Sequence, residues 1–210
     1  MKFGSLDDWL AWQESLHPAG VELGLGRVRE VYRRMGLALP PVAITVGGTN
    51  GKGSCVALLD AMLQQAGYHV GRYTSPHLAR YNERVCLDGR AVSDETLMTA
   101  FQRVEAARQG TLLTYFEFGT LAALAVFSEA SPDVVVLEVG LGGRLDAVNI
   151  VDADATLVTT VDLDHAAWLG DDRESIGREK AGIFRAGQAA VYGAGDPPQS
   201  VLDAAKTLGA

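Results

Sequence analysis

The chain has 210 residues, 48% hydrophobic and 21% charged, so it can bury a sizeable core and is not disordered throughout. Its formal charge of −8 and its lack of a long Lys/Arg run argue against binding to duplex nucleic acid or to a membrane surface, although backbone N–H groups could still hold a nucleotide. The chain has two cysteines, and its N-terminus lacks an apolar signal segment. It also has no apolar run near the ~20 residues that span a bilayer. These features predict a cytoplasmic protein.

The first part of the chain predicts two helices. Ser5 resembles a helix N-cap, and apolar residues follow it at helical spacing up to Leu16. A second helix is expected over residues 26–37, with Pro40-Pro41 beyond it. A loop from His17 to Leu25 joins the two helices.

From residue 42 onward, strand and helix patterns alternate. Strands are expected at residues 42–46, 69–73, 134–139, 155–161 and 189–192, and an Asp-Gly pair predicts a hairpin within residues 85–92. Helices are expected at residues 54–65, 93–108, 116–129 and 173–184, and again after residues 196–198.

This alternation predicts an α/β fold with a mostly parallel sheet, of the P-loop type, covered by helices on both faces. Ligands bind such sheets at the carboxyl ends of the strands. The informative loops are therefore those that follow Val46, Tyr73, Val139 and Val161.

The strongest functional signal is a glycine-rich loop between a strand and a helix. It reads Gly47-Gly48-Thr49-Asn50-Gly51-Lys52-Gly53-Ser54. Glycines let successive N–H groups point at one anion, the helix N-terminus adds its dipole, and Lys52 adds a charge. The strict P-loop pattern is not met, because Gly53 stands where a hydroxyl residue follows the Lys. An ordinary tight turn is the alternative interpretation.

Two further loops carry groups that could ligate a metal. Glu138 ends an otherwise apolar strand, where a carboxylate is costly unless it is paired or bound to a cation such as Mg²⁺. It could equally cap a neighbouring loop. His165 follows another strand within Asp162-Leu163-Asp164-His165, and it is either a ligand or a surface residue.

Ser75 and Lys180 are weaker signals when taken alone. Ser75 stands in Thr74-Ser75-Pro76-His77-Leu78, which could be a plain Ser-Pro turn. Lys180 stands in a predicted helix, where a solvated charge is the simplest interpretation.

Together these pieces resemble the Mur ligase family of ATP-dependent amide-forming enzymes, and within it the dihydrofolate synthase/folylpolyglutamate synthase branch. The carrying motifs follow in order along nearly the whole chain. They are Glu22-Leu23-Gly24-Leu25 with Arg27-Val28, the Gly48–Ser54 loop, Thr74–Leu78, Thr114–Phe118, Glu138–Asp146, Asp164-His165 and Arg178–Ile183. Gly53 between Lys52 and Ser54 resembles the folate branch rather than the cell-wall branch.

The resemblance implies a role for each motif. Gly48, Thr49, Asn50, Gly51, Lys52, Gly53 and Ser54 would hold the ATP phosphates. Ser75, Glu138 and His165 would ligate Mg²⁺, and Lys180, carbamylated by CO₂, would help to position a second Mg²⁺. Leu23, Thr114, Phe116 and Asp146 would contact the pterin. Lys52, Lys180 and His165 would be the catalytic residues.

The resemblance also implies a reaction and its partners. Dihydropteroate or a folate would be joined to L-glutamate through an acyl phosphate, in a protein expected to be a monomer. Members of the family are about twice as long, so residues 1–210 are expected to form an N-terminal ATP-binding and ligase domain, incomplete at its C-terminal end and without the second domain.

Three alternatives stay open at this point. The nearest is a cell-wall precursor ligase. A P-loop kinase or GTPase would need a base-reading or lid motif that the sequence does not display. The third is a non-catalytic nucleotide-binding module.

Overall fold

The computed structural model describes residues 3–17 and 21–210. Residues 18–20, part of the loop expected between the first two helices, lie outside the described residues. The strands are β1 (Val42–Gly47), β2 (Val70–Tyr73), β3 (Val85–Leu87), β4 (Arg90–Ala91), β5 (Val134–Glu138), β6 (Ala155–Val158) and β7 (Ala189–Tyr192). The helices are α1 (Leu6–Ser15), α2 (Gly26–Met35), α3 (Lys52–Gln65), α4 (Asp94–Arg108), α5 (Tyr115–Ala130), α6 (Ala166–Leu169), α7 (Arg173–Ala181) and α8 (Gln199–Leu208), with short 3₁₀ turns η1 (Tyr81–Arg84) and η2 (Ala147–Ile150).

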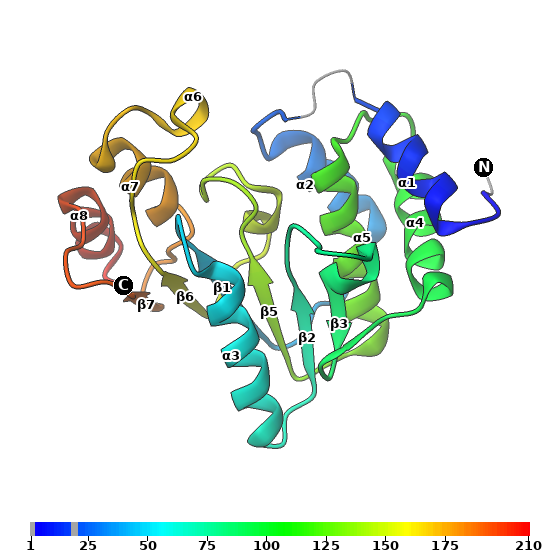
Figure 1. Ribbon diagram of the computed structural model, residues 1–210, viewed down its shortest axis with the longest axis horizontal. Helices are drawn as coiled ribbons and strands as arrows, with labels where there is room; N and C mark the ends of the chain where they lie inside the picture. The colour runs from blue at the N-terminus through cyan, green and yellow to red at the C-terminus, as the bar shows by residue number, and fades with distance from the viewer. Residues whose placement is uncertain (1–2, 18–20) are drawn as a thin grey trace.

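Within the described residues the strands form one sheet in the order β4-β3-β2-β5-β1-β6-β7 (Figure 1). β2, β5, β1, β6 and β7 are parallel, and the β3–β4 hairpin continues the sheet in antiparallel fashion beyond β2. The carboxyl ends of the five parallel strands therefore meet along a single edge. This confirms the predicted α/β architecture.

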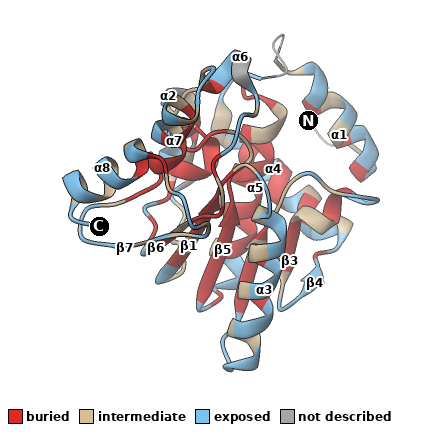
Figure 2. Ribbon diagram, turned by 60° about the vertical axis from the view of Figure 1, so that its left-hand side comes forward, coloured by how far each residue is buried: buried red, intermediate tan, exposed pale blue. Residues whose placement is uncertain are grey.

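Helices cover both faces of the sheet, but unequally. Among the helices of the described residues, α3 is the one that packs on one face, where its Val56 joins Val70, Val134 and Val136. On the other face lie α1, α2, α4 and α5 at the β2–β3 side, and α7 and α8 at the β6–β7 side. α5 is buried along most of its length, and Figure 2 shows it together with the strands as the buried centre of the molecule.

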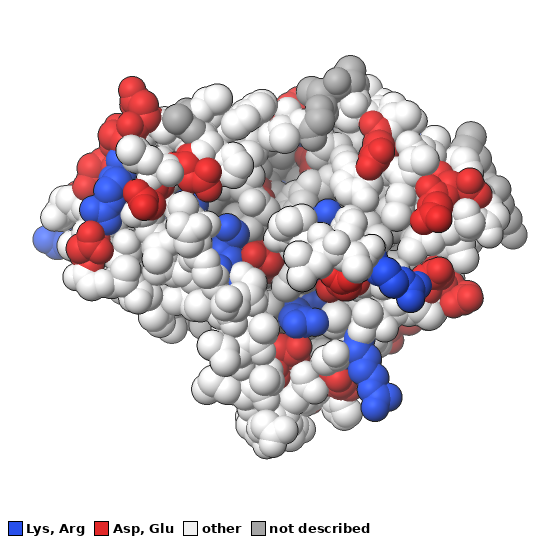
Figure 3. All heavy atoms as spheres, viewed as in Figure 1, with Lys and Arg blue, Asp and Glu red and all other residues white. Residues whose placement is uncertain are grey.

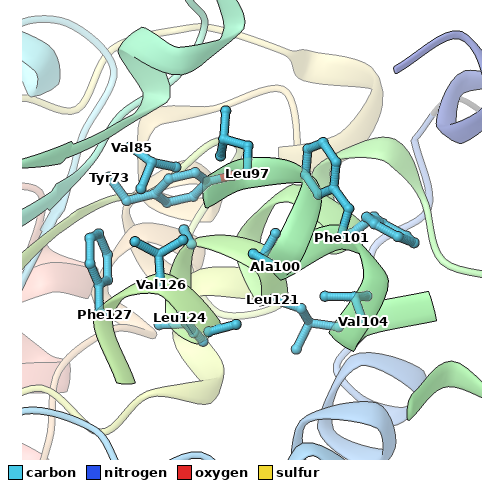
Figure 4. Packing of buried hydrophobic residues seen from close by; sticks show 14 of the residues in the cluster. Tyr73, Val85, Leu97, Ala100, Phe101, Val104, Leu121, Leu124, Val126 and Phe127 are labelled. Carbon is cyan, nitrogen blue, oxygen red and sulfur yellow. The ribbon is translucent and has the colours of Figure 1, made fainter. Parts of the chain in front are cut away.

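The largest core cluster joins α4 and α5 to β2 and β3. Phe101 and Leu97 of α4 pack over Tyr73, Val85 and the apolar face of α5 (Figure 4). Phe118 of α5 contacts both Phe101 and Trp12, with ring centroids 5.7 and 5.8 Å apart. This core anchors the N-terminus of α5, which forms one wall of the site described below.

Helix caps explain why most boundaries agree with the sequence. The hydroxyls of Ser5, Ser93 and Thr114 accept hydrogen bonds from N–H groups in the first turns of α1, α4 and α5. α2 ends at Gly36 in a left-handed conformation, before the two prolines are reached. β6 ends at Val158 rather than at residue 161, because the next residues turn to contact the glycine-rich loop.

Candidate functional site

The glycine-rich loop connects the carboxyl end of β1 to α3, as predicted. Gly51 adopts φ +82° and serves as the N-cap of α3, so the first N–H groups of the helix face the loop. The ammonium of Lys52 turns back and donates to the carbonyls of Gly48 and Thr49, at 3.0 and 3.2 Å. The loop is thus a strand–turn–helix anion cradle with one internal cation.

Residues after β6 hold this loop in place. The Thr159 hydroxyl donates to the carbonyl of Asn50 at 2.7 Å, and the Thr49 N–H donates to the carbonyl of Thr160 at 2.8 Å. A Cβ at Gly48 would come within 1.9 Å of the Thr159 hydroxyl oxygen, so the close approach requires glycine. The sequence analysis missed Thr159 and Thr160, although two hydroxyl residues at the end of a strand beside such a loop were a usable signal.

Glu138 is buried at the carboxyl end of β5, next to β1. Its Oε2 accepts the N–H of Ser75 at 3.0 Å, so it does cap the neighbouring loop, while Oε1 accepts no hydrogen bond from any described residue. Burial raises the pKa of Glu138, and the Ser75 N–H and the charges of Lys52 and Arg72 oppose that rise. The cap leaves one carboxylate oxygen available to a cation beside Ser75.

Lys180 is buried, with 3% of its surface exposed, so the interpretation of a solvated helix charge is wrong. None of the hydrogen bonds and ion pairs among the described residues engages its ammonium. The pKa of Lys180 is lowered to about 8, mainly by burial and also by the charge of Lys52, while the charge of Asp164 opposes this fall. A buried amine of low pKa beside a phosphate-type loop is the form of lysine that reacts with CO₂ at neutral pH.

His165 lies between β6 and α6, with φ +48° and an exposed side chain 3.6 Å from the Asp164 carboxylate. The described contacts do not bring it against Glu138. In residues 3–17 and 21–210, no group of three or more His, Cys, Asp or Glu side chains is arranged to hold a metal ion.

A cavity of about 300 Å³ opens beside this site. Its lining includes Leu23, Ser75, Thr114, Phe116 and Asp146, which brings all four predicted substrate residues together with one predicted metal ligand. In Figure 3 the surface is hollowed between the α6–α7 side and the α1–α2 side, above the strand ends. The walls are mainly apolar and aromatic, which suits a flat ring system.

Asp146 is one of two buried acids in the lining of this cavity, beside Glu117, among the described residues. It accepts the N–H groups of Leu141 at 2.8 Å and Val148 at 2.9 Å. Burial raises its pKa to about 7, although these hydrogen bonds and the charge of Lys52 act in the opposite direction. Near neutral pH this carboxyl group can therefore either donate or accept a hydrogen bond at a ligand.

Arg27 links two segments of the cavity wall. Its Nε donates to Glu117 at 2.8 Å, and its other nitrogens bond to the side chain and carbonyl of Glu22. Glu117 in turn accepts the N–H of Thr114 at 2.8 Å as part of a capping box. Arg27 thus fixes the loop that carries Leu23 onto the N-terminus of α5.

Comparison with known proteins identifies related sequences. A family model described as the Mur ligase middle domain matches residues 46–208. The curated dihydrofolate synthase/folylpolyglutamate synthase of Escherichia coli K12 is 52% identical over 206 residues, which cover 98% of this chain and 49% of the relative.

Solved structures agree with these matches. E. coli FolC in complex with DHPP and ADP superposes with a TM-score of 0.97 at 51% identity, over 99% of this chain and 50% of that one. A bifunctional folylpolyglutamate synthase/dihydrofolate synthase with Mn, AMPPNP and L-glutamate bound gives a TM-score of 0.92 at 54% identity, over 98% of this chain and 50% of that one. The chain thus spans about half the length of these relatives.

Proposed function

The chain belongs to the Mur ligase family. We propose that the full-length protein containing it is an ATP-dependent ligase. Its reaction would join L-glutamate to dihydropteroate, to the terminal glutamate of folates, or to both. The alternative of a cell-wall precursor ligase is less well supported, because the similar curated relatives carry folate-enzyme names.

The proposal rests on one observation: the charge of Lys52 affects the pKa values of three buried ionisable groups. The charge of Lys52 acts on Glu138 at the end of β5, on Asp146 in the loop after β5 and on Lys180 in α7. Groups with shifted pKa values gathered at strand ends beside a cavity are typical of a catalytic site. A purely structural turn would not need them.

The reaction has two steps. The carboxylate of the acid attacks the γ-phosphorus of ATP, the bond to ADP breaks with its electron pair leaving on ADP, and an acyl phosphate forms. The α-amino group of L-glutamate then attacks the acyl carbon, inorganic phosphate leaves, and the amine gives up a proton. Positioning and charge neutralisation supply most of the rate in such phosphoryl transfers.

This chain's residues bind and orient the reactants. The N–H groups of residues 48–54 surround the phosphates, and Lys52 exchanges its bonds to Gly48 and Thr49 for phosphate oxygens. The cavity holds the pterin between Phe116, Thr114 and Asp146, with Leu23 on the loop fixed by Arg27. A ring bound there directs its carboxylate toward Ser75 and Glu138.

The donors present fit Mg²⁺, a hard cation that prefers oxygen ligands. Glu138, through its unpaired Oε1, would hold one ion together with Ser75 and His165, and a carbamylated Lys180 would help to hold a second. Mg²⁺ bound there supplies Lewis-acid neutralisation of the phosphate charge. Carbamylation replaces the ammonium of Lys180, which Lys52 repels, with an anion that Lys52 attracts.

The remaining parts of the proposal concern the whole protein. Residues 1–210 are the N-terminal ATP-binding and ligase portion of a longer monomer, which acts in the cytoplasm without a nucleic-acid or membrane partner. No helix within the described residues is long and apolar enough to cross a bilayer.

The test is an assay of the full-length protein with ATP, dihydropteroate and L-glutamate. We expect a glutamylated product and one ADP per product, with no product when any substrate is omitted. Lys52→Ala should lower turnover by about 10²- to 10³-fold or more, as loss of a transition-state donor does. Lys206→Ala, an exposed lysine on α8, is the matched control. A wild-type protein that hydrolyses ATP without forming an amide would contradict the proposal.

A further inference from the structure

Arg84 lies in the wall of the cavity, at the end of η1, and no acidic group among the described residues forms an ion pair with it. Its Nε donates to Nδ1 of His77 at 2.9 Å, and its guanidinium lies over the rings of Tyr81 and Tyr115, 5.2 and 5.6 Å from their centroids. Because a guanidinium has no acceptor, Arg84 is the donor and Nδ1 of His77 is the acceptor in this hydrogen bond.

The acidic groups of the cavity have other partners, although Oε1 of Glu117 is buried without a hydrogen bond. Glu22 and Glu117 both bind Arg27, and Asp146 accepts backbone N–H groups. In the described part of the lining, Arg84 is therefore the one cation, and none of these acids serves as its counter-ion. The two aromatic rings hold the guanidinium plane of Arg84 in one orientation. The terminal nitrogens of this guanidinium stay available to a ligand.

The backbone places Arg84 beside the metal-side loop. Its carbonyl accepts the N–H of Thr74 at 2.9 Å, and the next residue, Ser75, donates its N–H to Glu138. Arg84 thus adjoins the strand end toward which a bound acid must direct its carboxylate for activation by ATP.

We infer that Arg84 binds the carboxylate of the aromatic acid held in this cavity and so orients it for phosphorylation. The inference rests on the proposed function, and it adds a substrate-binding residue for the anionic end of the ligand. A planar guanidinium matches a carboxylate with two parallel hydrogen bonds, which a neutral amide cannot accept in the same way.

The experiment compares dihydropteroate with its primary carboxamide as ligands of the full-length protein, by calorimetric titration. Arg84→Met should weaken binding of the acid by about 10- to 100-fold, the usual cost of losing a hydrogen bond to a charged group, and leave the affinity for the carboxamide nearly unchanged. Arg84→Lys keeps the positive charge but not the two parallel N–H donors of the guanidinium, so this variant should lose part of the preference for the acid over the carboxamide. Arg80→Met, an exposed residue of the same segment outside the cavity lining, should change neither affinity.

The possible outcomes are distinct. Equal weakening of acid and carboxamide would mean that Arg84 only supports the cavity wall, and unchanged binding of the acid would place the carboxylate elsewhere; either result overturns the inference alone. If Arg84→Met does not fold, an unaltered preference for the acid in Arg84→Lys overturns it. Failure of the wild-type protein to bind dihydropteroate contradicts the proposed function, and the inference with it.

Discussion

The site gathers ionisable side chains in a place where each is costly to bury. Glu138, Asp146 and Lys180 are all nearly inaccessible to solvent, and burial is the largest cause of the pKa shift of each. Hydrogen bonds from backbone N–H groups offset part of this cost for the two acids. The amine has no such compensation, which makes Lys180 the most informative single residue.

Lys180→Ala in the full-length enzyme should reduce turnover severely, because the alanine cannot carry a carbamate beside the phosphates. A short carboxylic acid added to the assay should restore part of the activity by supplying the missing anion. Turnover with and without the acid, measured alongside Lys206→Ala, checks this expectation. If Lys180→Ala has wild-type activity, Lys180 has only a structural role.

Asp146 makes the stability of the fold depend on pH. Because its folded pKa of about 7 lies above the ordinary value of 3.8, the folded state binds a proton that the unfolded state has released, and stability falls as pH rises from about 4 to about 7. Each unit of such a shift corresponds to about 1.4 kcal/mol.

Asp146→Asn should therefore be closest to wild type in stability near pH 7 and fall furthest behind near pH 4. Urea unfolding of both proteins across this range measures the difference. A constant difference would show that Asp146 titrates alike in the folded and unfolded chains.

At the scale of the elements, the loop after β6 supports the glycine-rich loop after β1. The hydrogen bonds that join them include Thr159 to Asn50, Thr49 to Thr160, and the Thr49 hydroxyl to the carbonyl of Asp162 at 3.2 Å. Since β1 and β6 are neighbours in the sheet, the two loops leave the same edge side by side. The anion cradle is thereby formed before any ligand arrives.

Thr159→Val should weaken nucleotide binding and lower the free energy of unfolding by about 1–3 kcal/mol, because the carbonyl of Asn50 loses its shorter hydrogen bond and keeps only that from Thr160 at 3.5 Å. Thr156→Val is the control, since Thr156 is equally buried in β6 but donates to Ala189, away from the loop. Nucleotide affinity reduced in Thr159→Val alone supports the contact. An equal loss of nucleotide affinity in both variants would mean that the loss comes from lower stability of the fold and not from the contact between Thr159 and Asn50.

The sequence predicted most elements because local signals and tertiary structure agree. Ser93 begins α4 and Asp88-Gly89 turns the β3–β4 hairpin as their residue types suggest. The predicted and observed elements differ where long-range contacts set the structure. β6 ends early because Thr159 turns toward Gly47 and Asn50. The short helix α6 was not predicted.

The candidate residues divide in the same way. The Gly48–Ser54 loop was predictable from spacing, and Leu23, Thr114, Phe116 and Asp146 entered by resemblance and line one cavity. The burial of Lys180 and the unpaired charge of Arg84 depend on residues distant in sequence, so no local pattern reveals them. The contribution of His165 to a metal site stays a prediction.

At the scale of the whole molecule, the site lies at an open edge. The strand ends, the glycine-rich loop and the cavity face the same side, with α6 and α7 on one flank and α1 and α2 on the other (Figures 1 and 3). An acyl phosphate formed there must be shielded from water until the amine attacks. Relatives are about twice as long, and we expect the residues of the full-length protein beyond this chain to cover the edge and provide the shield.

The 210-residue chain alone should therefore be a poor ligase even when folded. Its glutamate-dependent product formation should be far below that of the full-length protein, while nucleotide binding persists. Parallel assays at equal protein concentration measure this. Ligation near the full-length rate would show that closure by further residues is not needed.

The central claim is that a carboxylate is activated by phosphorylation and then joined to an amine. The direct measurement uses dihydropteroate labelled with ¹⁸O in its carboxylate, together with ATP, L-glutamate and the full-length protein, and determines the isotope in the inorganic phosphate by mass spectrometry. If an acyl phosphate forms, one carboxylate oxygen is transferred to phosphate in each turnover, so labelled phosphate should equal amide product. Amide product accompanied by unlabelled phosphate would contradict the account.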